Sequence, residues 1–163
     1  MYTVKEKTLS SEAVRWIGTK EEHARLLLDS YKRLTGKTLL VEQAGQSLAE
    51  AMEEAPFVVL SHGLEDDPIL NYGNRMARKL WEIDEATLLT TPSRLTAEPM
   101  ERDERARFLA RVSEQGYVDD YTGIRISSLG RRFFIVNATV WNLVDDSGAY
   151  RGQAAMFAEH RDI

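Results

Sequence analysis

Four polar side chains interrupt apolar runs near the end of the chain, and they are candidates for binding chemistry. Asn137, Thr139 and Trp141 lie within residues 131–144, which are otherwise rich in Ile, Val, Phe and Ala, and Gln153 lies in the next apolar run. A buried amide must be hydrogen-bonded, and a ligand can be its partner. Asn137 is therefore the first candidate for an interior contact. Alternation along a strand places Thr139 and Trp141 on the same face as Asn137, although Trp141 also fits an ordinary core position.

Two further candidates belong to short apolar segments in the middle of the chain. His62 ends the run that begins at Pro56, directly before Gly63, and Asn71 lies in the following run. Imidazole titrates near neutrality, so His62 could contact a ligand or act as a pH switch. The alternative is a hydrogen-bonded histidine that fixes a turn.

Charge is dense around a predicted helix start that includes Arg94, Glu98, Arg102 and Arg105. Arginines over a pocket mouth, Arg94 among them, could clamp a carboxylate or a phosphate bidentately. The alternative is a solvated face with salt bridges.

Several kinds of chemistry are excluded or disfavoured. The chain has no cysteine, which excludes disulfides and thiolate catalysis. Its three histidines are scattered, so we predict no metal site. Ser61 and His62 are adjacent and would point to opposite faces of a strand, and we identify no catalytic residue.

The composition limits the partners and the cellular location that we expect for the protein. A net charge of −5 disfavours nucleic-acid binding through a basic surface. No apolar run approaches the ~20 residues of a membrane span, and the start lacks the apolar core of a signal peptide. We therefore expect a cytoplasmic protein without a membrane partner.

These candidates must be positioned by a sheet. Turn residues at 128–130 and 145–148 separate three β-branched and aromatic runs between residues 121 and 158, which predicts a three-stranded antiparallel meander. Its middle strand, about residues 131–144, is apolar on both faces and should be covered on both.

The preceding segments predict the remaining elements of an α+β fold. Apolar spacing and capping residues predict helices at about 19–36 and 42–54, two short strands between residues 56 and 73, several short helices, and a longer helix at 98–115. We divide the chain into a helical extension, residues 1–54, and a domain of residues 55–163. The extension could cover its own sheet or pair with a second copy.

This order of elements resembles that of a PAS domain, and the local sequence resembles the MEKHLA family, in its standalone bacterial form. The segments that carry the resemblance are residues 60–63, 66–74, 92–99, 123–131 and 138–141. The resemblance implies a five-stranded antiparallel sheet with short helices on one face and an N-terminal helical extension.

The resemblance also implies a sensory or protein-interaction module without its own output domain. Its partners would be a small organic ligand, a protein or a second copy of the chain. Haem is disfavoured because the long helix has no histidine, and the cysteinyl adduct of light-sensing flavin domains is excluded. Plain flavin binding stays open, and the cofactor is unknown.

Two other readings remain. One is an enzyme with a cone-shaped α+β pocket, like ketosteroid isomerase, which would place an acid or a histidine base in an apolar cavity. The other is an interaction domain whose pocket is collapsed around Phe and Met side chains.

Overall fold

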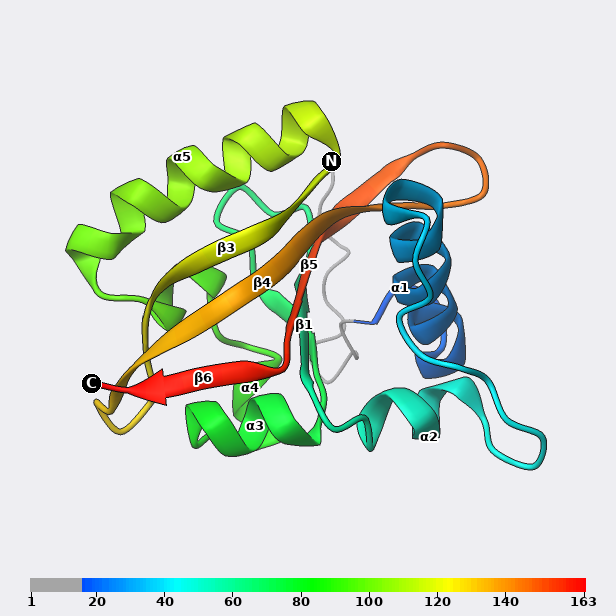
Figure 1. Ribbon diagram of the computed structural model, residues 1–163, viewed down its shortest axis with the longest axis horizontal. Coiled ribbons are helices and arrows are strands. Elements are labelled where there is room, and N and C mark those ends of the chain that lie inside the picture. Colours follow the sequence, from blue (N-terminus) through cyan, green and yellow to red (C-terminus); the bar gives the residue numbers. More distant parts are fainter. Residues whose placement is uncertain (1–15) are drawn as a thin grey trace.

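The computed structural model describes residues 16–163, with the side chains of residues 99–102 left out of the description. A twisted sheet forms its centre, and helices lie on both sides of it (Figure 1). In chain order the elements are α1 (Lys20–Thr35), α2 (Leu48–Glu53), β1 (Val58–His62), β2 (Leu70–Gly73), α3 (Arg75–Trp81), α4 (Glu85–Leu88), the 3-10 helix η1 (Ser93–Thr96), α5 (Pro99–Gln115), β3 (Tyr117–Ile126), β4 (Arg132–Val144), β5 (Tyr150–Phe157) and β6 (Glu159–Asp162).

The sheet confirms the predicted antiparallel meander and extends it. Its strand order is β2-β1-β5-β4-β3, and every pairing is antiparallel. A sixth strand, β6, pairs with β4 beyond the end of β5. β5 and β6 therefore pair with successive parts of β4 in the same register. The sequence did not indicate β6 because its residues, Glu159–Asp162, are polar and exposed.

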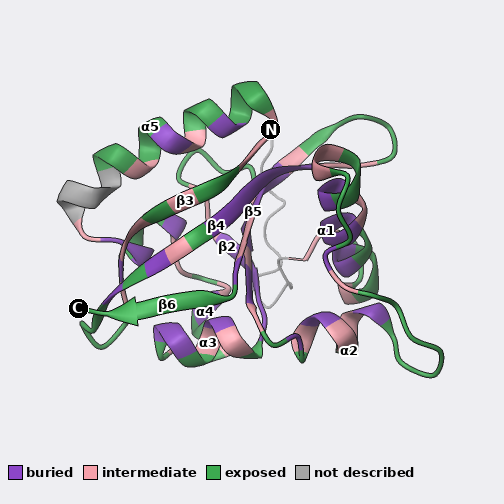
Figure 2. Cartoon of the chain, in the orientation of Figure 1, coloured by how far each residue is buried: buried purple, intermediate pink, exposed green. Residues whose placement is uncertain are grey.

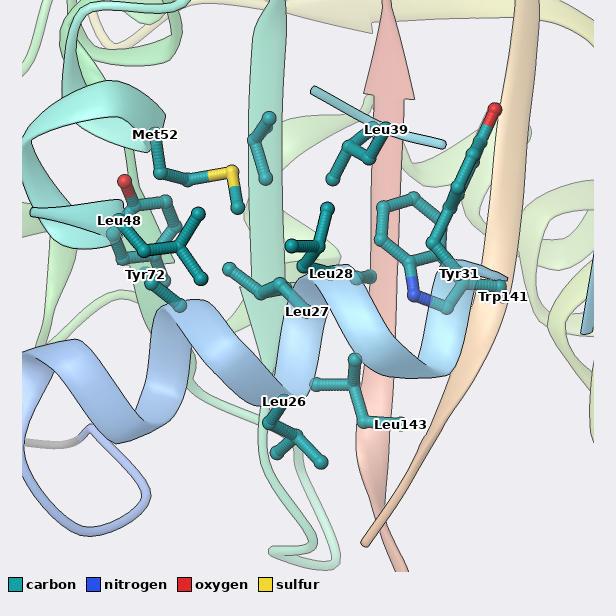
Figure 3. Packing of buried hydrophobic residues seen from close by; sticks show 13 residues of the cluster. Leu26, Leu27, Leu28, Tyr31, Leu39, Leu48, Met52, Tyr72, Trp141 and Leu143 are labelled. Carbon is teal, nitrogen blue, oxygen red and sulfur yellow. The ribbon is translucent and has the colours of Figure 1, made fainter. Parts of the chain in front are cut away.

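One face of the sheet is covered by the N-terminal helices. Leu27 of α1 and Met52 of α2 are completely buried in a cluster that also holds Trp141 and Leu143 of β4 (Figure 3). Tyr31 of α1 meets Trp141 edge to face, with 5.0 Å between ring centres. The extension therefore folds back on its own sheet.

The other face is covered by α3 and α5. Trp81 at the end of α3 meets Phe133 of β4 and Phe157 of β5 at ring-centre distances of 5.2 and 6.1 Å. Val112 of α5 packs on Val140 of β4. The expectation that the middle strand is covered on both sides is confirmed, and most of β4 is buried (Figure 2).

Local signals explain where the first two helices begin. Thr19 and Glu22 form a capping box at the start of α1, and Ser47 and Glu50 form another at the start of α2. The predicted start of the second helix near residue 42 is wrong. Gly45 adopts a φ of 83°, a left-handed conformation that a helix cannot continue through, and the helix starts only after Ser47.

A β-bulge in β4 changes which residues share a face. Asn137 has a φ of 51°, and the pairing of β4 with β3 shifts between Ala138 and Ile135. One extra residue in a strand reverses the alternation beyond it. Phe133 and Ile135 therefore lie on the α3 side of the sheet, whereas Trp141 lies on the α1 side.

Within residues 16–163, no helix combines the length and the apolar character that crossing a bilayer requires.

Candidate functional site

A small cavity lies between the sheet and the α3–α5 layer. Its volume is about 60 Å³, and its walls are mainly apolar, with Leu60, Ile135 and Val140 from the sheet and Phe108 from α5. Polar side chains in the lining include those of His62, Arg105, Tyr121, Arg125 and Gln153. Among the described side chains, no Asp or Glu lines this cavity.

His62 contributes an unsatisfied polar atom to the lining. Its side chain is only 8% exposed, and its Nδ1 lies 3.1 Å from the carbonyl oxygen of Gly63. Nδ1 therefore carries the proton, and Nε2 is a buried acceptor without a partner. Burial is the largest cause that holds the pKa of His62 below its usual value, and the charge of Arg105 adds to it. The Gly63 carbonyl, the charge of Glu65 and the Gln153 side chain act in the opposite direction, and the ring is neutral at pH 7.

Two arginines bring positive charge to the cavity. Arg105 of α5 donates to the hydroxyl of Ser93 at 2.5 Å, and Arg125 of β3, only 5% exposed, donates to the carbonyl of Ile124 and to Tyr121 Oη. Desolvation, followed by the like charge of Arg125, lowers the pKa of Arg105 to about 10. Neither guanidinium pairs with a carboxylate among the described side chains.

The aromatic part of the wall is held in place by stacking. The rings of Phe108 and Tyr121 lie 4.1 Å apart, which joins α5 to β3 beside the two arginines. Trp81 also lines the cavity, and its indole Nε1–H is buried without a partner.

Gln153 links the sheet to α5. Its Nε2 lies within hydrogen-bonding distance of the Leu109 carbonyl oxygen (3.2 Å) and of the side-chain oxygens of Ser113 (3.2 Å) and Asn142 (3.1 Å). Asn142, its neighbour across the strands, donates to the Val112 carbonyl. These two amides satisfy helix carbonyls and fix the roof of the cavity over the sheet.

Of the seven predicted site residues, the structure brings only His62 and Gln153 to the cavity. The predicted interior position of Asn137 is wrong, because its side chain is exposed at the bulge. Thr139 and Trp141 are buried, but the reversed alternation turns Trp141 toward α1.

The other two predicted residues have partners elsewhere. Arg94 is exposed and forms an ion pair with Asp67, with 3.0 Å between Nε and Oδ2, so it belongs to a solvated face. Asn71 accepts a hydrogen bond from the hydroxyl of Ser61. Arg102, from the same charged group as Arg94, has a side chain outside the described part of the chain.

Ser61 belongs to a buried polar chain on the opposite face of the sheet. The amide of Ile17 donates to Nδ1 of His23, so Nε2 of this ring carries the proton and donates to Ser61 Oγ at 3.0 Å. Ser61 in turn donates to Asn71 at 2.5 Å. Because His23 is the donor, it does not act as a base toward Ser61, and the arrangement stabilises the fold rather than activating a nucleophile.

The sequence analysis missed the contribution of Arg125 and did not separate Arg105 from the surrounding charges. Alternation along β3 predicts Arg125 on the solvent side, opposite the apolar Ile124 and Ile126, so no local signal indicates that it is buried. Arg105 has no such signal, since α5 carries charged residues on most of its surface. No cluster of three or more potential metal ligands occurs among the described side chains.

Comparison with known proteins agrees with this architecture. A model of the MEKHLA domain family matches residues 21–162. No match was found among curated proteins.

Solved structures with a similar fold include sensory domains. A PAS domain from Colwellia psychrerythraea aligns with a TM-score of 0.57 and 16% identity, over 71% of this chain and 92% of that one. The blue-light photoreceptor Vivid in its photo-excited state aligns with a TM-score of 0.55 and 12% identity, over 82% and 94%. The PAS domain of a LuxR-family transcriptional regulator from Burkholderia thailandensis, in complex with ethanol, has a TM-score of 0.50 and 18% identity, over 65% and 91%.

At these identities the solved structures show the fold alone, and the family match covers most of the sequence. The predicted resemblance and the predicted PAS-like fold are both confirmed. The chain belongs to the MEKHLA domain family and has the fold of PAS-type sensory domains.

Proposed function

We propose that this domain is a small-molecule sensor whose ligand occupies the cavity between the sheet and α5. The observation that carries the proposal is the set of polar groups that line the cavity without a matching partner among the described side chains: Nε2 of His62 has no hydrogen-bond partner, and the guanidinium groups of Arg105 and Arg125 have no carboxylate. Burying a polar or charged group without a partner costs free energy. A bound ligand would satisfy these groups, and the cost would then be recovered on binding.

The size of the cavity supports a ligand of few atoms. At about 60 Å³ it lies well below the roughly 300 Å³ at which pockets for drug-sized ligands begin. The Burkholderia PAS domain was solved with ethanol, a ligand of this size class. A flavin ring is far larger, and a cysteinyl adduct is impossible in a chain without cysteine, so we assign no step to a flavin.

The response to the ligand would pass to a partner protein or to a second copy of the chain. The N-terminal helix α1 packs on the opposite face of β4, whose Val140 lines the cavity. A cytoplasmic setting and a homodimer are predictions from the sequence.

An enzyme of the ketosteroid-isomerase type has less support. That chemistry needs a base in the pocket, and among the described side chains the lining contains no Asp or Glu. His62 is the one candidate base among the described residues of the lining.

The test is identification of a bound molecule. The full chain is purified under native conditions, unfolded, and the released small molecules are identified by mass spectrometry against a buffer blank. A single compound in near-stoichiometric amount supports the sensor. If no compound is released and a panel of small metabolites, charged and neutral, leaves the unfolding temperature unchanged, the domain is an interaction module and the proposal is wrong.

A further inference from the structure

We propose that the cavity recognises a short hydroxy acid, with its carboxylate held by Arg105 and Arg125 and its hydroxyl donating to Nε2 of His62. This inference rests on the proposed function and adds the chemical class of the ligand.

The charge of the site favours an anion. Two guanidinium groups line one cavity, and no described acidic side chain balances them. Desolvation, and after it the like charge of Arg125, lower the pKa of Arg105, so the charged form of Arg105 is destabilised in this site. A carboxylate between them would remove both the repulsion and the desolvation cost, and arginine is the side chain best suited to hold it through two parallel hydrogen bonds.

Hydrogen bonds hold both arginine side chains in place without using all of their N–H donors. Arg125 is oriented by the Ile124 carbonyl at 2.7 Å and by Tyr121 Oη at 2.8 Å, and its guanidinium stacks on the Tyr121 ring. Arg105 is oriented by Ser93 Oγ. A guanidinium has more N–H donors than these contacts use, so both groups retain donors in fixed directions for a ligand.

The acceptor atom of His62 determines which second polar group suits the ligand. Nδ1 of His62 donates to the carbonyl oxygen of Gly63, so Nε2 is an acceptor that can take a hydrogen bond from a donor on the ligand. An ammonium group would donate, but it would add a third positive charge next to two arginines. A hydroxyl donates without charge, so a hydroxy acid fits the site better than an amino acid.

The volume of the cavity limits the number of heavy atoms in the ligand. About 10–15 Å³ accommodates one water-sized atom, so a volume of about 60 Å³ accommodates roughly four to six heavy atoms. Glycolate and lactate are in this range. The apolar wall around Leu60 and Val140 suits the short carbon part of such a molecule.

The experiment measures binding of sodium glycolate to the full chain by calorimetry and by the shift in unfolding temperature. Its neutral isostere glycolamide, ethanol, glycine and sodium phosphate are the comparison compounds. We expect glycolate to raise the unfolding temperature in a concentration-dependent way, and glycolamide and glycine to bind at least about tenfold more weakly, because a charge-assisted hydrogen bond is lost or a cation is added.

Arg105→Gln and Arg107→Gln form a matched pair of variants. Both residues are in α5, but Arg107 is exposed and does not line the cavity. We expect R105Q to weaken glycolate binding at least about tenfold and R107Q to leave it within about twofold. Without ligand, R105Q should unfold at the same temperature as the wild type or higher, because it removes an unbalanced charge. If R105Q does not fold, Arg105→Lys keeps the charge but loses the planar fork, and it should show the same loss of affinity.

Equal affinities for glycolate and glycolamide, equal effects of R105Q and R107Q, or a response to phosphate alone would each overturn the inference. These outcomes are separable from a failure of the proposed function. If ethanol or another neutral molecule binds and the carboxylates do not, the domain is a small-molecule sensor and only the assigned ligand class is wrong.

Discussion

His23 in α1 and Ser61 in β1 share a hydrogen bond of 3.0 Å across 38 positions of sequence, and both side chains are buried. The bond crosses from the N-terminal extension to the central sheet. It continues to Asn71 in β2, so three elements are joined through one polar chain. We infer that the extension is part of the cooperative unit that folds around the sheet.

The buried His23 should make the protein sensitive to mild acid. Burial lowers the pKa of His23 from 6.5 to about 4, so between these values the unfolded chain takes up a proton that the folded protein does not. The free energy of unfolding is therefore highest above pH 6.5 and falls as the pH decreases toward 4, by about 3 kcal/mol from this group. The pKa of His62 is lowered as well, so His62 acts in the same direction.

Urea unfolding of the wild type and of His23→Gln at pH 7 and pH 4.5 measures this effect. Gln can still donate to Ser61 but does not titrate, so the variant should be less stable at pH 7 and lose less stability on acidification. Parallel losses in the two proteins would show that His23 is not the source.

Asn74 should be one of the most sensitive polar positions. Its side chain is fully buried, accepts from the amides of Val59 and Ala77, and donates to the carbonyls of Met52 and Phe57. Asn74→Ala leaves these groups unpaired and should cost about 3 kcal/mol or more.

Asn74→Asp keeps the size but cannot donate, and should also be strongly destabilised. The matched control is Asp84→Ala, which removes the exposed N-cap of α4 and should cost about 1 kcal/mol. Chemical denaturation measures both, and similar costs at residues 74 and 84 would contradict the assigned role of Asn74.

Leu27→Ala tests whether α1 is part of the core. Leu27 is completely buried in the cluster between α1 and the sheet, and its truncation should destabilise the whole protein by about 3 kcal/mol in a single unfolding transition. Val41→Ala, at a position that is 72% exposed, should change the stability by less than about 0.5 kcal/mol. A separate early transition in Leu27→Ala, with the sheet unaffected, would mean that α1 is a detachable appendage.

Asn137 should be replaceable by glycine but not by a β-branched residue. At a φ of 51° valine is strained, so Asn137→Val should cost about 1–2 kcal/mol, whereas Asn137→Gly should be neutral or slightly stabilising. Thermal unfolding distinguishes the two variants. Equal tolerance of valine and glycine would show that the bulge relaxes in solution.

Local signals were sufficient to predict most of the fold. These signals determine structure within a few residues of their own position. Examples are the two turns of the meander, Pro99 at the start of α5 and Gly116 at its end. The apolar character of both faces of β4 likewise required two covering layers. The sequence could not predict β6, because a polar strand forms only where a neighbouring strand offers unpaired backbone groups.

The candidate site was less predictable because it depends on contacts between distant segments. The face occupied by Trp141 was misjudged since a single left-handed residue, Asn137, reverses the alternation and asparagine gives only a weak signal for it. The burial of Arg125 depends on its stacking with Tyr121 and on the layer that covers β3. Gln153 was found because a lone amide in an apolar strand is unusual whatever lies around it.

Val140 and Trp141 are successive residues of β4, one in the cavity wall and the other against Tyr31 of α1. Successive side chains of a strand leave opposite surfaces of a single layer of peptide units. The cavity and helix α1 are thus separated at this point only by the backbone of β4. A ligand that moved Val140 would therefore also move Trp141 and its contact with Tyr31 through the backbone of β4 itself.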